Sequence, residues 1–344
     1  MSRDAFILGA GFSRAISEEM PLLAELGEQV LNLLGPNAPE VLPNLPPADF
    51  ENWLSFLAED DPWLREDERL GNRSVFLQIS RLLCDLISAR ESATRQDAPP
   101  DWLRMLVARW HEDEAAVITF NYDTLVEAAF TETVRVYSRP NSENKNYVYP
   151  SQVFRAPLTP IGARAGAVVV PDSIRTFRLL KLHGSRTWLY SGRDPFFGET
   201  IYDATLFRTW ADSDAYERPW LLADKVPLVV PPTAGKTGFF NNETVRLQWR
   251  LAYEALQEAD RTFVVGYSLP PTDLLTRVLL QVGSRAGSTV VAVNRDSGVV
   301  GRLTTALPSS KVESIIYPDA LQRLAEFLAP TTREPCVYLE SNQS

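Results

Sequence analysis

The sequence predicts an α/β fold built on a mostly parallel sheet with helices on both faces. Seven apolar runs of strand length recur, and they are continuous rather than alternating, as in strands covered on both sides. Helical patterns separate several of them, and strands that alternate with helices form layered sheets with right-handed crossovers. The predicted strands are 5–8, 115–119, 177–182, 226–230, 262–265, 289–293 and 312–317.

A long helical interval interrupts the alternation after the first strand. Apolar residues recur there at helical spacing, as in Phe50, Trp53, Leu54 and Leu57. No run between residues 20 and 112 is typical of a strand. We therefore expect an all-helical insertion over 20–112.

Two irregular intervals and a polar tail complete the predicted organisation. Residues 131–174 and 186–225 show no clear period and are expected to form irregular insertions. Residues 1–330 are then one domain, and residues 331–344 form a polar C-terminal tail with little to bury.

Composition and charge narrow the functional classes. The 344 residues are 45% hydrophobic and 23% charged, which is typical of a globular protein rather than a disordered one. The net charge is −10, so nucleic acid is not expected as the main ligand, because phosphate neutralisation requires a positive surface. One basic cluster is interpreted as a solvated face beside a strand. It consists of Arg164, Arg175, Arg178, Lys181 and Arg186.

Neither membrane contact nor a structural metal is expected. No apolar run approaches the roughly 18 residues of a spanning helix, and the N-terminus lacks the pattern of a signal peptide. We therefore expect a cytoplasmic protein. The two cysteines, Cys84 and Cys336, are too few for a four-cysteine zinc site.

Polar side chains follow two predicted strands at the point where each strand ends. Asn121 and Asp123 come after 115–119, and His183 comes after 177–182. In open α/β sheets the carboxyl ends of the strands carry the ligand site. Asn121 can hold ribose hydroxyls or orient a water, and neutral His183 can take a proton from a sugar hydroxyl. Asp123 can equally be a plain helix cap, and a lone histidine can be structural.

Three more small or polar clusters follow predicted strands. Residues 9–13 read Gly-Ala-Gly-Phe-Ser, and such a turn lets backbone N–H groups approach a pyrophosphate, although it can also be a simple tight turn. Arg14 stands where the third glycine of G-x-G-x-x-G belongs, so the dinucleotide fingerprint is incomplete. Gly266 with Ser268, and Asn294, follow later strands and could bind phosphate and ribose.

The order and spacing of these motifs resemble those of the sirtuin family, which binds NAD on a Rossmann-like sheet. In particular, the chain resembles the bacterial sirtuin-like NAD hydrolases of antiphage defence, in which Phe-Asn-Tyr-Asp replaces the Gln-Asn-Ile-Asp of the deacylases. The matching motifs are Gly-Ala-Gly-Phe-Ser at 9–13, Thr-Phe-Asn-Tyr-Asp at 119–123, Lys-Leu-His-Gly at 181–184, Gly-Tyr-Ser at 266–268 and Val-Asn at 293–294.

The resemblance implies a role for each matched residue. Asn121 would contact the nicotinamide ribose and its attacking water, and His183 would be the acid/base group at the ribose. The other residues that would contact NAD are Gly9, Ala10, Gly11, Phe12, Ser13, Asp123, Gly266, Ser268 and Asn294.

Two departures from the deacylases favour hydrolysis. Deacylating sirtuins carry a four-cysteine zinc module, which this chain cannot form, so no zinc is expected. They also continue from the glycine-rich turn into Pro-Asp-Phe-Arg, whereas residues 17–23 here read Ser-Glu-Glu-Met-Pro-Leu-Leu. The element that positions nicotinamide and shields the sugar carbon is therefore changed, and water becomes the expected acceptor. The resemblance thus implies that NAD is the substrate and is cleaved to nicotinamide and ADP-ribose.

The resemblance also implies that this activity is gated, because unregulated loss of NAD kills the host. The expected role is that of an effector of antiphage defence, which acts through NAD depletion and abortive infection. The trigger would be a separate protein, such as a HerA-like ATPase or a short Argonaute, or assembly into a homo-oligomer.

Other functions stay open on the sequence alone. A deacylase or ADP-ribosyltransferase would use the same NAD site but requires a groove for a peptide or protein acceptor. A non-catalytic module that binds NAD or ADP-ribose would keep the glycine turn without turnover. A nicotinamide-dependent dehydrogenase is disfavoured by the missing third glycine, and NADP is an alternative substrate.

Overall fold

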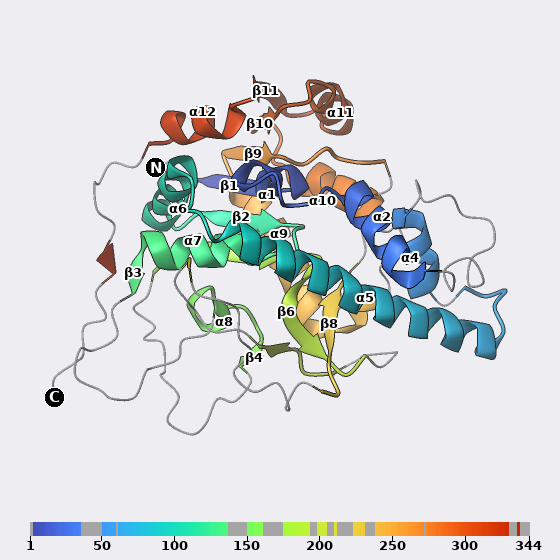
Figure 1. The fold of residues 1–344 in the computed structure, drawn as a ribbon. Helices are drawn as coiled ribbons and strands as arrows, with labels where there is room; N and C mark the ends of the chain where they lie inside the picture. The colour runs from blue at the N-terminus through green and yellow to red at the C-terminus, as the bar shows by residue number, and fades with distance from the viewer. Residues whose placement is uncertain are drawn as a thin grey trace, which may run out of the picture.

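A six-stranded parallel sheet forms the centre of the fold, with strand order β11-β10-β9-β1-β2-β5 (Figure 1). This arrangement confirms the predicted α/β class. The strands are β1 (Asp4–Leu8), β2 (Ala116–Thr119), β5 (Arg178–Lys181), β9 (Arg261–Val265), β10 (Thr289–Asn294) and β11 (Lys311–Ile316). The computed structural model describes residues 3–35, 50–59, 61–136, 150–160, 175–192, 198–204, 210–211, 223–230, 238–271, 273–329 and 336–337.

Strand β1 lies in the middle of the sheet and is buried along its whole length. Leu8, its last residue, lies opposite Thr119 of β2 and Val265 of β9. The carboxyl ends of the three strands therefore meet at one edge, and the segments that leave them are brought together there.

Helices cover both faces of the sheet. Successive residues of a strand point to opposite sides, and in β1 the residues on both sides are apolar and buried. Phe6 and Leu8 belong to one hydrophobic cluster, and Ala5 and Ile7 to the other. The first cluster is closed by α6 (Asp101–Asp113), α7 (Leu125–Thr133) and α12 (Ala320–Phe327). The second is closed by α9 (Glu243–Glu258), α10 (Leu274–Gly283) and α11 (Gly298–Ala306).

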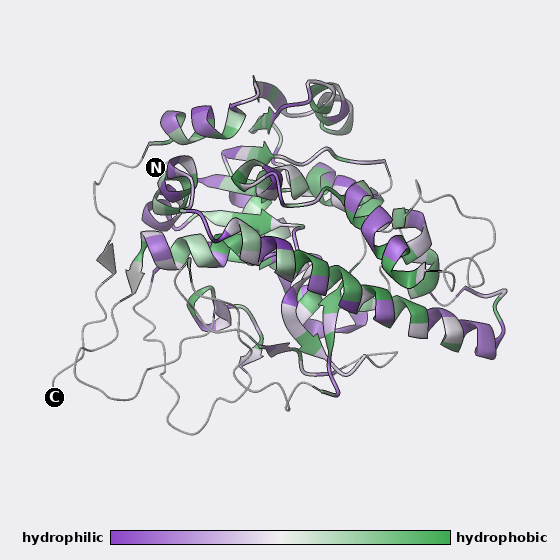
Figure 2. Ribbon diagram, in the orientation of Figure 1, coloured by the Kyte–Doolittle hydropathy of each residue, from purple (hydrophilic) through white to green (hydrophobic). Residues whose placement is uncertain are grey.

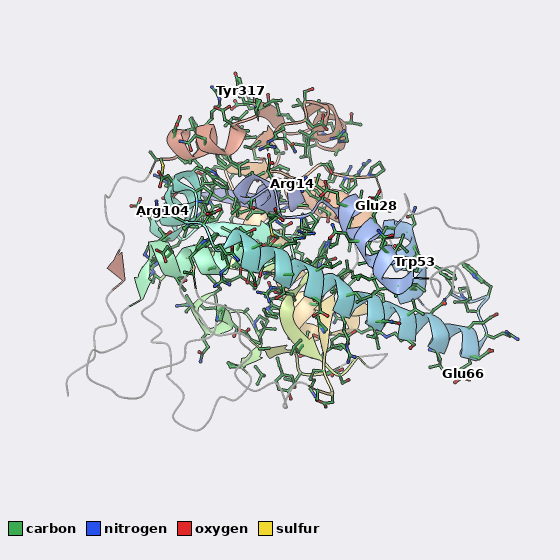
Figure 3. The ribbon with its side chains drawn as sticks, in the orientation of Figure 1. Arg14, Glu28, Trp53, Glu66, Arg104 and Tyr317 are labelled. Carbon is green, nitrogen blue, oxygen red and sulfur yellow. The ribbon has the colours of Figure 1, made fainter. Side chains whose placement is uncertain are left out.

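The described elements between β1 and β2 are all helices, as the apolar spacing predicts. They are α1 (Ala10–Ile16), α2 (Leu23–Leu34), α4 (Phe50–Ala58), α5 (Glu66–Thr94) and α6. Apolar and polar residues are interspersed along α5, as expected of a long helix that buries one side (Figure 2). Its hydrophilic first turn protrudes from the molecule, with Glu66 at the tip (Figure 3).

A second sheet, of order β4-β7-β6-β8, corrects two expectations. The run 226–230 does not join the parallel sheet, because β8 (Val226–Val229) pairs antiparallel with β6 (Gly184–Tyr190). Part of the interval 186–225 is likewise strand rather than irregular. Gly184 explains the change of sheet: its φ is +80°, and a Cβ there would lie 2.1 Å from the Leu228 carbonyl oxygen, so only glycine permits this approach. The remaining strands are β4 (Thr159–Pro160) and β7 (Tyr202–Asp203).

The interpretation of the basic cluster as a solvated face is wrong for two of its members. Lys181 and Arg186 are 3% and 2% exposed. The Lys181 ammonium lies 2.9 Å from Glu127 on α7, and Arg186 donates from Nε to Glu91 on α5 at 2.5 Å. Neither glutamate is near its partner in the sequence, which is why the residue run alone suggested solvent exposure.

Two described residues near the end of the chain form a short strand pair. Residues Cys336–Val337 (β12) pair in parallel with Arg135–Val136 (β3), so this part of the predicted tail is not free. The rest of the tail lies outside the described residues, as does Arg164. Short helical turns occur at Pro150–Val153 (α8) and Phe239–Asn241 (η4). Within the described ranges, no helix is long and apolar enough to cross a membrane.

Candidate active site

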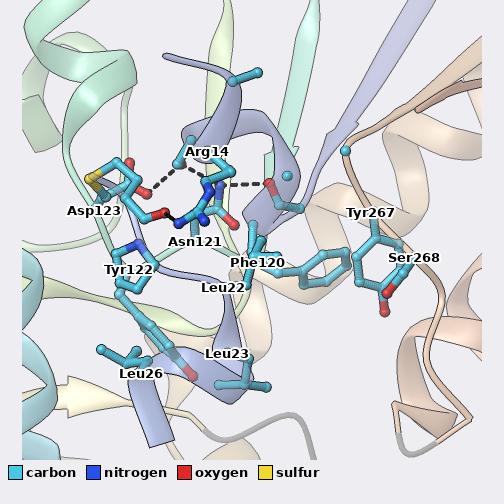
Figure 4. A pocket seen from close by; sticks show the side chains of 18 of the residues that line it. Arg14, Leu22, Leu23, Leu26, Phe120, Asn121, Tyr122, Asp123, Tyr267 and Ser268 are labelled. Atoms are coloured by element: carbon cyan, nitrogen blue, oxygen red, sulfur yellow. Dashed lines mark hydrogen bonds between the residues drawn. The ribbon is translucent and has the colours of Figure 1, made fainter. Parts of the chain in front are cut away.

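A cavity of about 600 Å³ opens at the carboxyl edge of the parallel sheet (Figure 4). The segments that follow β1, β2, β5, β9 and β10 all contribute to its wall. All of the predicted site residues except Phe12 line it. They are Gly9, Ala10, Gly11, Ser13, Asn121, Asp123, His183, Gly266, Ser268 and Asn294.

Phe12 does not line the cavity. Its side chain is 1% exposed and packs against Trp102 and Trp110 of α6, with ring centroids 5.6 and 6.1 Å away. Phe12 therefore anchors α1 to the hydrophobic core, and the small residues around it face the opening.

Asn121 is held by hydrogen bonds that fix the orientation of its amide. Nδ2 donates to the Gly9 carbonyl oxygen at 3.0 Å and to Ser13 Oγ at 2.9 Å, and the backbone N–H donates to Thr119 Oγ1 at 3.1 Å (Figure 4). An amide nitrogen has two hydrogens to donate, and both are used here. Toward a ligand, Asn121 can therefore act only through Oδ1, as an acceptor.

Asp123 combines the two roles left open by the sequence. Its Oδ2 accepts from Ser13 Oγ at 2.6 Å, which links it to Asn121, and its Oδ1 accepts from the Leu125 backbone N–H at 3.3 Å, at the start of α7. Burial raises the pKa of Asp123, and the positive charge of Lys181 and the Ser13 hydrogen bond oppose this rise. The carboxyl is thus both part of the cavity wall and a local cap.

His183 lies in the same cavity and is only 3% exposed. Aromatic rings surround it, with centroids 4.9 Å away for Phe120, 6.4 Å for Tyr122 and 6.5 Å for Trp249. Its Nε2 lies 3.9 Å from Oδ2 of Asp273. The structure therefore brings His183 and Asn121 together and packs the imidazole on several sides.

The glycines of the β1 turn allow close packing against the loop after β9. The N–H of Gly9 donates to the Val265 carbonyl oxygen at 3.0 Å, and that of Gly11 donates to the Gly266 carbonyl oxygen at 2.9 Å. A Cβ on Gly9 would lie 2.6 Å from Tyr267 Cα. Free N–H groups were the reason to expect phosphate binding at these glycines, but these two amides are engaged with the neighbouring turn.

The turn after β10 and the loop after β9 are likewise tied together. Asn294 Oδ1 accepts from the N–H groups of Arg295 and Asp296 at 2.8 and 3.2 Å, and Asn294 Nδ2 lies 3.4 Å from the Tyr267 carbonyl oxygen. The Ser268 carbonyl oxygen accepts from Arg302 at 2.7 Å. Both segments are therefore pre-shaped parts of the wall.

Replacement of Gly266 by alanine is expected to destabilise the site by two separate effects. Its φ is +60°, and a Cβ would lie 2.2 Å from the Phe12 backbone nitrogen. Gly287 offers a matched control, because its φ is +79° but nothing lies within 4 Å of its Cβ position. Gly287→Ala should lower the free energy of unfolding by about 1–2 kcal/mol through backbone strain alone. Gly266→Ala should cost roughly 1–3 kcal/mol more because of overpacking. Denaturant unfolding of the two variants measures the difference, and equal losses would contradict the close approach.

Sequence reasoning missed two polar residues of this site. The guanidinium of Arg14 donates to the Met20 carbonyl oxygen at 2.9 Å and to both carboxylate oxygens of Glu25 at 2.9 and 3.0 Å. It thereby holds the segment 20–23, which lines the cavity. In the sequence, Arg14 is notable only as the residue at the position of the missing third glycine. Asp273 is the second, and its signal was an aspartate directly before an apolar helical run.

No metal site accompanies this cavity in the part of the chain that the structure describes, where no group of His, Cys, Asp and Glu side chains could hold an ion.

Comparison with known proteins gives distant structural similarity only. No protein-family model and no curated protein matches the sequence. Among solved structures, a complex of a Sir2 homolog with NAD has 13% identity and a TM-score of 0.46, over 95% of this chain and 88% of that one. A mutant Sir2 homologue in complex with ADP-ribose has 14% identity and a TM-score of 0.43, over 95% and 90%. A structure of Sir2 enzymes has 16% identity and a TM-score of 0.40, over 95% and 92%. These values are too low to assign a family, and the description of the fold rests on its own strand order.

Proposed function

We propose that this chain hydrolyses NAD to nicotinamide and ADP-ribose. The observation that carries the proposal is the linked set Asn121, Ser13 and Asp123, which shares one cavity with His183 at the carboxyl edge of the sheet. The cavity volume of about 600 Å³ is in the range of small-molecule sites. The motif order that resembles the sirtuin family supports NAD as the substrate.

The proposed reaction does not require covalent catalysis by the protein. The bond between C1′ of the ribose and the pyridinium nitrogen breaks, and its electron pair neutralises the leaving nicotinamide. Water then adds to the oxocarbenium-like carbon and loses a proton. A site for this reaction mainly orients the ribose, stabilises positive charge and admits one water.

Asn121 and His183 fit these tasks. Because Asn121 presents only Oδ1, it would accept a hydrogen bond from a ribose hydroxyl or from the attacking water, and so aim that oxygen. His183 would take up the proton as a neutral imidazole. The wall formed by residues 9–13, 266–268 and Asn294 would lie along the ADP part of the substrate.

Release of nicotinamide from NAD by the purified protein tests the proposal. We expect release by the wild type and a fall on the order of 100-fold or more in His183→Ala. Lys311→Ala, on exposed β11 and outside the cavity, should retain wild-type release. Release that depends on an acetylated peptide and yields acylated ADP-ribose would indicate a deacylase instead. Tight NAD binding without release under any condition would indicate a binding module.

We further propose that the reaction is gated and serves antiphage defence through NAD depletion. The support is the resemblance to the bacterial sirtuin-like NAD hydrolases. The same assay over a range of protein concentrations distinguishes the gates. A steep rise in activity per protein would favour a homo-oligomer, whereas activity only on addition of a HerA-like ATPase or a short Argonaute would favour a separate activator.

A further inference from the structure

The loop after β9 and the first turn of α10 bring a buried carboxylate to the imidazole of His183. Asp273 is 1% exposed, and its Oδ2 lies 3.9 Å from His183 Nε2. This separation is longer than a hydrogen bond but within the range in which opposite charges interact strongly in a buried site. The sequence motifs did not include Asp273.

Three features favour the ionised form of Asp273. Tyr267 donates its hydroxyl hydrogen to Oδ2 at 2.7 Å, and the backbone N–H of Thr276 donates to Oδ1 at 3.4 Å. Asp273 is also the N-cap of α10, a ten-residue helix whose N-terminus carries partial positive charge. Hydrogen bonds to a carboxylate and a helix N-terminus both stabilise its negative charge.

We propose that Asp273 is a positioning residue that holds a proton on His183 during the reaction. The inference rests on the proposed NAD hydrolysis. When His183 accepts a proton, the imidazole becomes a cation in a nearly water-free position, and the carboxylate of Asp273 stabilises that cation. Tyr267 keeps the carboxylate in place, because its ring packs on Phe120, which in turn packs on His183 at 4.9 Å.

The other ionisable groups at this edge are arranged differently. Asp123 accepts a hydrogen bond from Ser13, and Lys181 forms an ion pair with Glu127, so each of these groups already has a partner. Tyr122 lies beside the imidazole as a neutral ring and donates its hydroxyl hydrogen to the Val230 carbonyl oxygen at 3.0 Å. Two further charged residues of the wall are paired elsewhere, Asp296 with Arg302 at 2.8 Å and Arg14 with Glu25 at 2.9 Å. Asp273 is the carboxylate that lies 3.9 Å from His183.

A titration of the histidines tests the pairing without any assay of activity. The chain has two histidines, His111 and His183, so the imidazole resonances of labelled protein are assigned with one substitution. In Asp273→Asn and Asp273→Ser, which keep an N-cap acceptor, the titration midpoint of His183 should fall by about 1–2 pH units because a neighbouring negative charge is lost. His111 should be unchanged, since it lies at the end of α6 beside Thr176.

Tyr267→Phe distinguishes the effect of the negative charge of Asp273 from the effect of a structural disturbance around His183. This variant removes a donor from Asp273 and leaves the negative charge, so the His183 midpoint should stay or rise. A fall in Tyr267→Phe, or a shift under about 0.3 units in both Asp273 variants, would overturn the proposal. If neither Asp273 variant folds, a rise of the His183 midpoint in Tyr267→Phe supports the proposal, and an unchanged or lower midpoint overturns it.

Turnover gives the second readout. At neutral pH, kcat for nicotinamide release should fall about 10- to 100-fold in Asp273→Asn while KM changes less than about threefold, because Asp273 is proposed to act through His183 rather than by binding the substrate. A loss confined to KM would contradict a role through His183. If the midpoint shifts as expected but even the wild type releases no nicotinamide, the proposed function fails and the pairing of Asp273 with His183 stands.

Discussion

Asn121→Ala should reduce nicotinamide release by about 100- to 1,000-fold, with little change in stability. The substitution removes the Oδ1 acceptor through which Asn121 would aim the ribose or the water, and misplacement of a reacting group by about 1 Å already costs on the order of 100-fold. The stability change should be small because Gly9 and Gly11 keep their hydrogen bonds to the β9 loop. Steady-state rates of nicotinamide release, with unfolding measured in parallel, check both parts.

Ser13→Ala is the matched comparison for Asn121. The Ser13 hydroxyl accepts from Asn121 and donates to Asp123, so its loss frees one amide hydrogen of Asn121 and leaves Oδ1 in place. We expect an intermediate fall of about 10-fold, since orientation is loosened and the acceptor is retained. A loss in Ser13→Ala as large as in Asn121→Ala would mean that Asn121 acts through the network rather than directly.

Glu91→Leu should lower the free energy of unfolding by about 3–5 kcal/mol, because it leaves the buried guanidinium of Arg186 without its carboxylate. Glu91 is completely buried on α5 and accepts from Arg186 on β6 and from Thr124, the N-cap of α7. The Glu91 carboxylate thus links α5, β6 and the start of α7, next in sequence to Tyr122 and Asp123. Denaturant unfolding measures the loss, provided that the slope of the unfolding free energy against denaturant concentration is the same in the variant and the wild type.

Two further variants distinguish the effect of leaving Arg186 unpaired from the effect of losing a glutamate side chain. Glu91→Leu combined with Arg186→Met removes both charges and should recover much of the stability, since a buried ion pair contributes little beyond a well-packed apolar pair. Glu254→Ala on α9 breaks an exposed pair with Arg250 and should change stability by less than about 0.5 kcal/mol. A loss below about 1 kcal/mol for Glu91→Leu alone would show that water or another acceptor satisfies Arg186.

The sheet and the edge that carries the site could be predicted from the sequence for a physical reason. Strands covered on both faces are continuous apolar runs, so their ends are visible as the first polar or glycine residue. Asn121, His183 and Gly266 were found in this way, and the cavity brings all three together. The helical interval after β1 was equally visible from the spacing of its apolar residues.

What the sequence could not give was the identity of partners distant along the chain. Lys181 and Arg186 suggest a solvated basic face until the fold brings Glu127 and Glu91 to them from 54 and 95 residues away. The second sheet was hidden for a similar reason, because the apolar run 226–230 looks the same in a parallel or an antiparallel pairing. In the sequence Asp273 only precedes an apolar helical run, and it is the fold that places its carboxylate 3.9 Å from His183.

The central place of β1 has a consequence for the protein during its synthesis. β1 precedes the other five strands of its sheet along the chain, yet β9, one of its two neighbours, lies 257 residues further on. At ordinary rates of translation this delay is roughly 13–50 s, during which the turn 9–13 has no Gly266 to pack against. The cavity is therefore absent from the nascent chain and from any fragment that stops before β9. Under the proposed NAD hydrolysis, this delay would keep unfinished copies inactive while they are still on the ribosome.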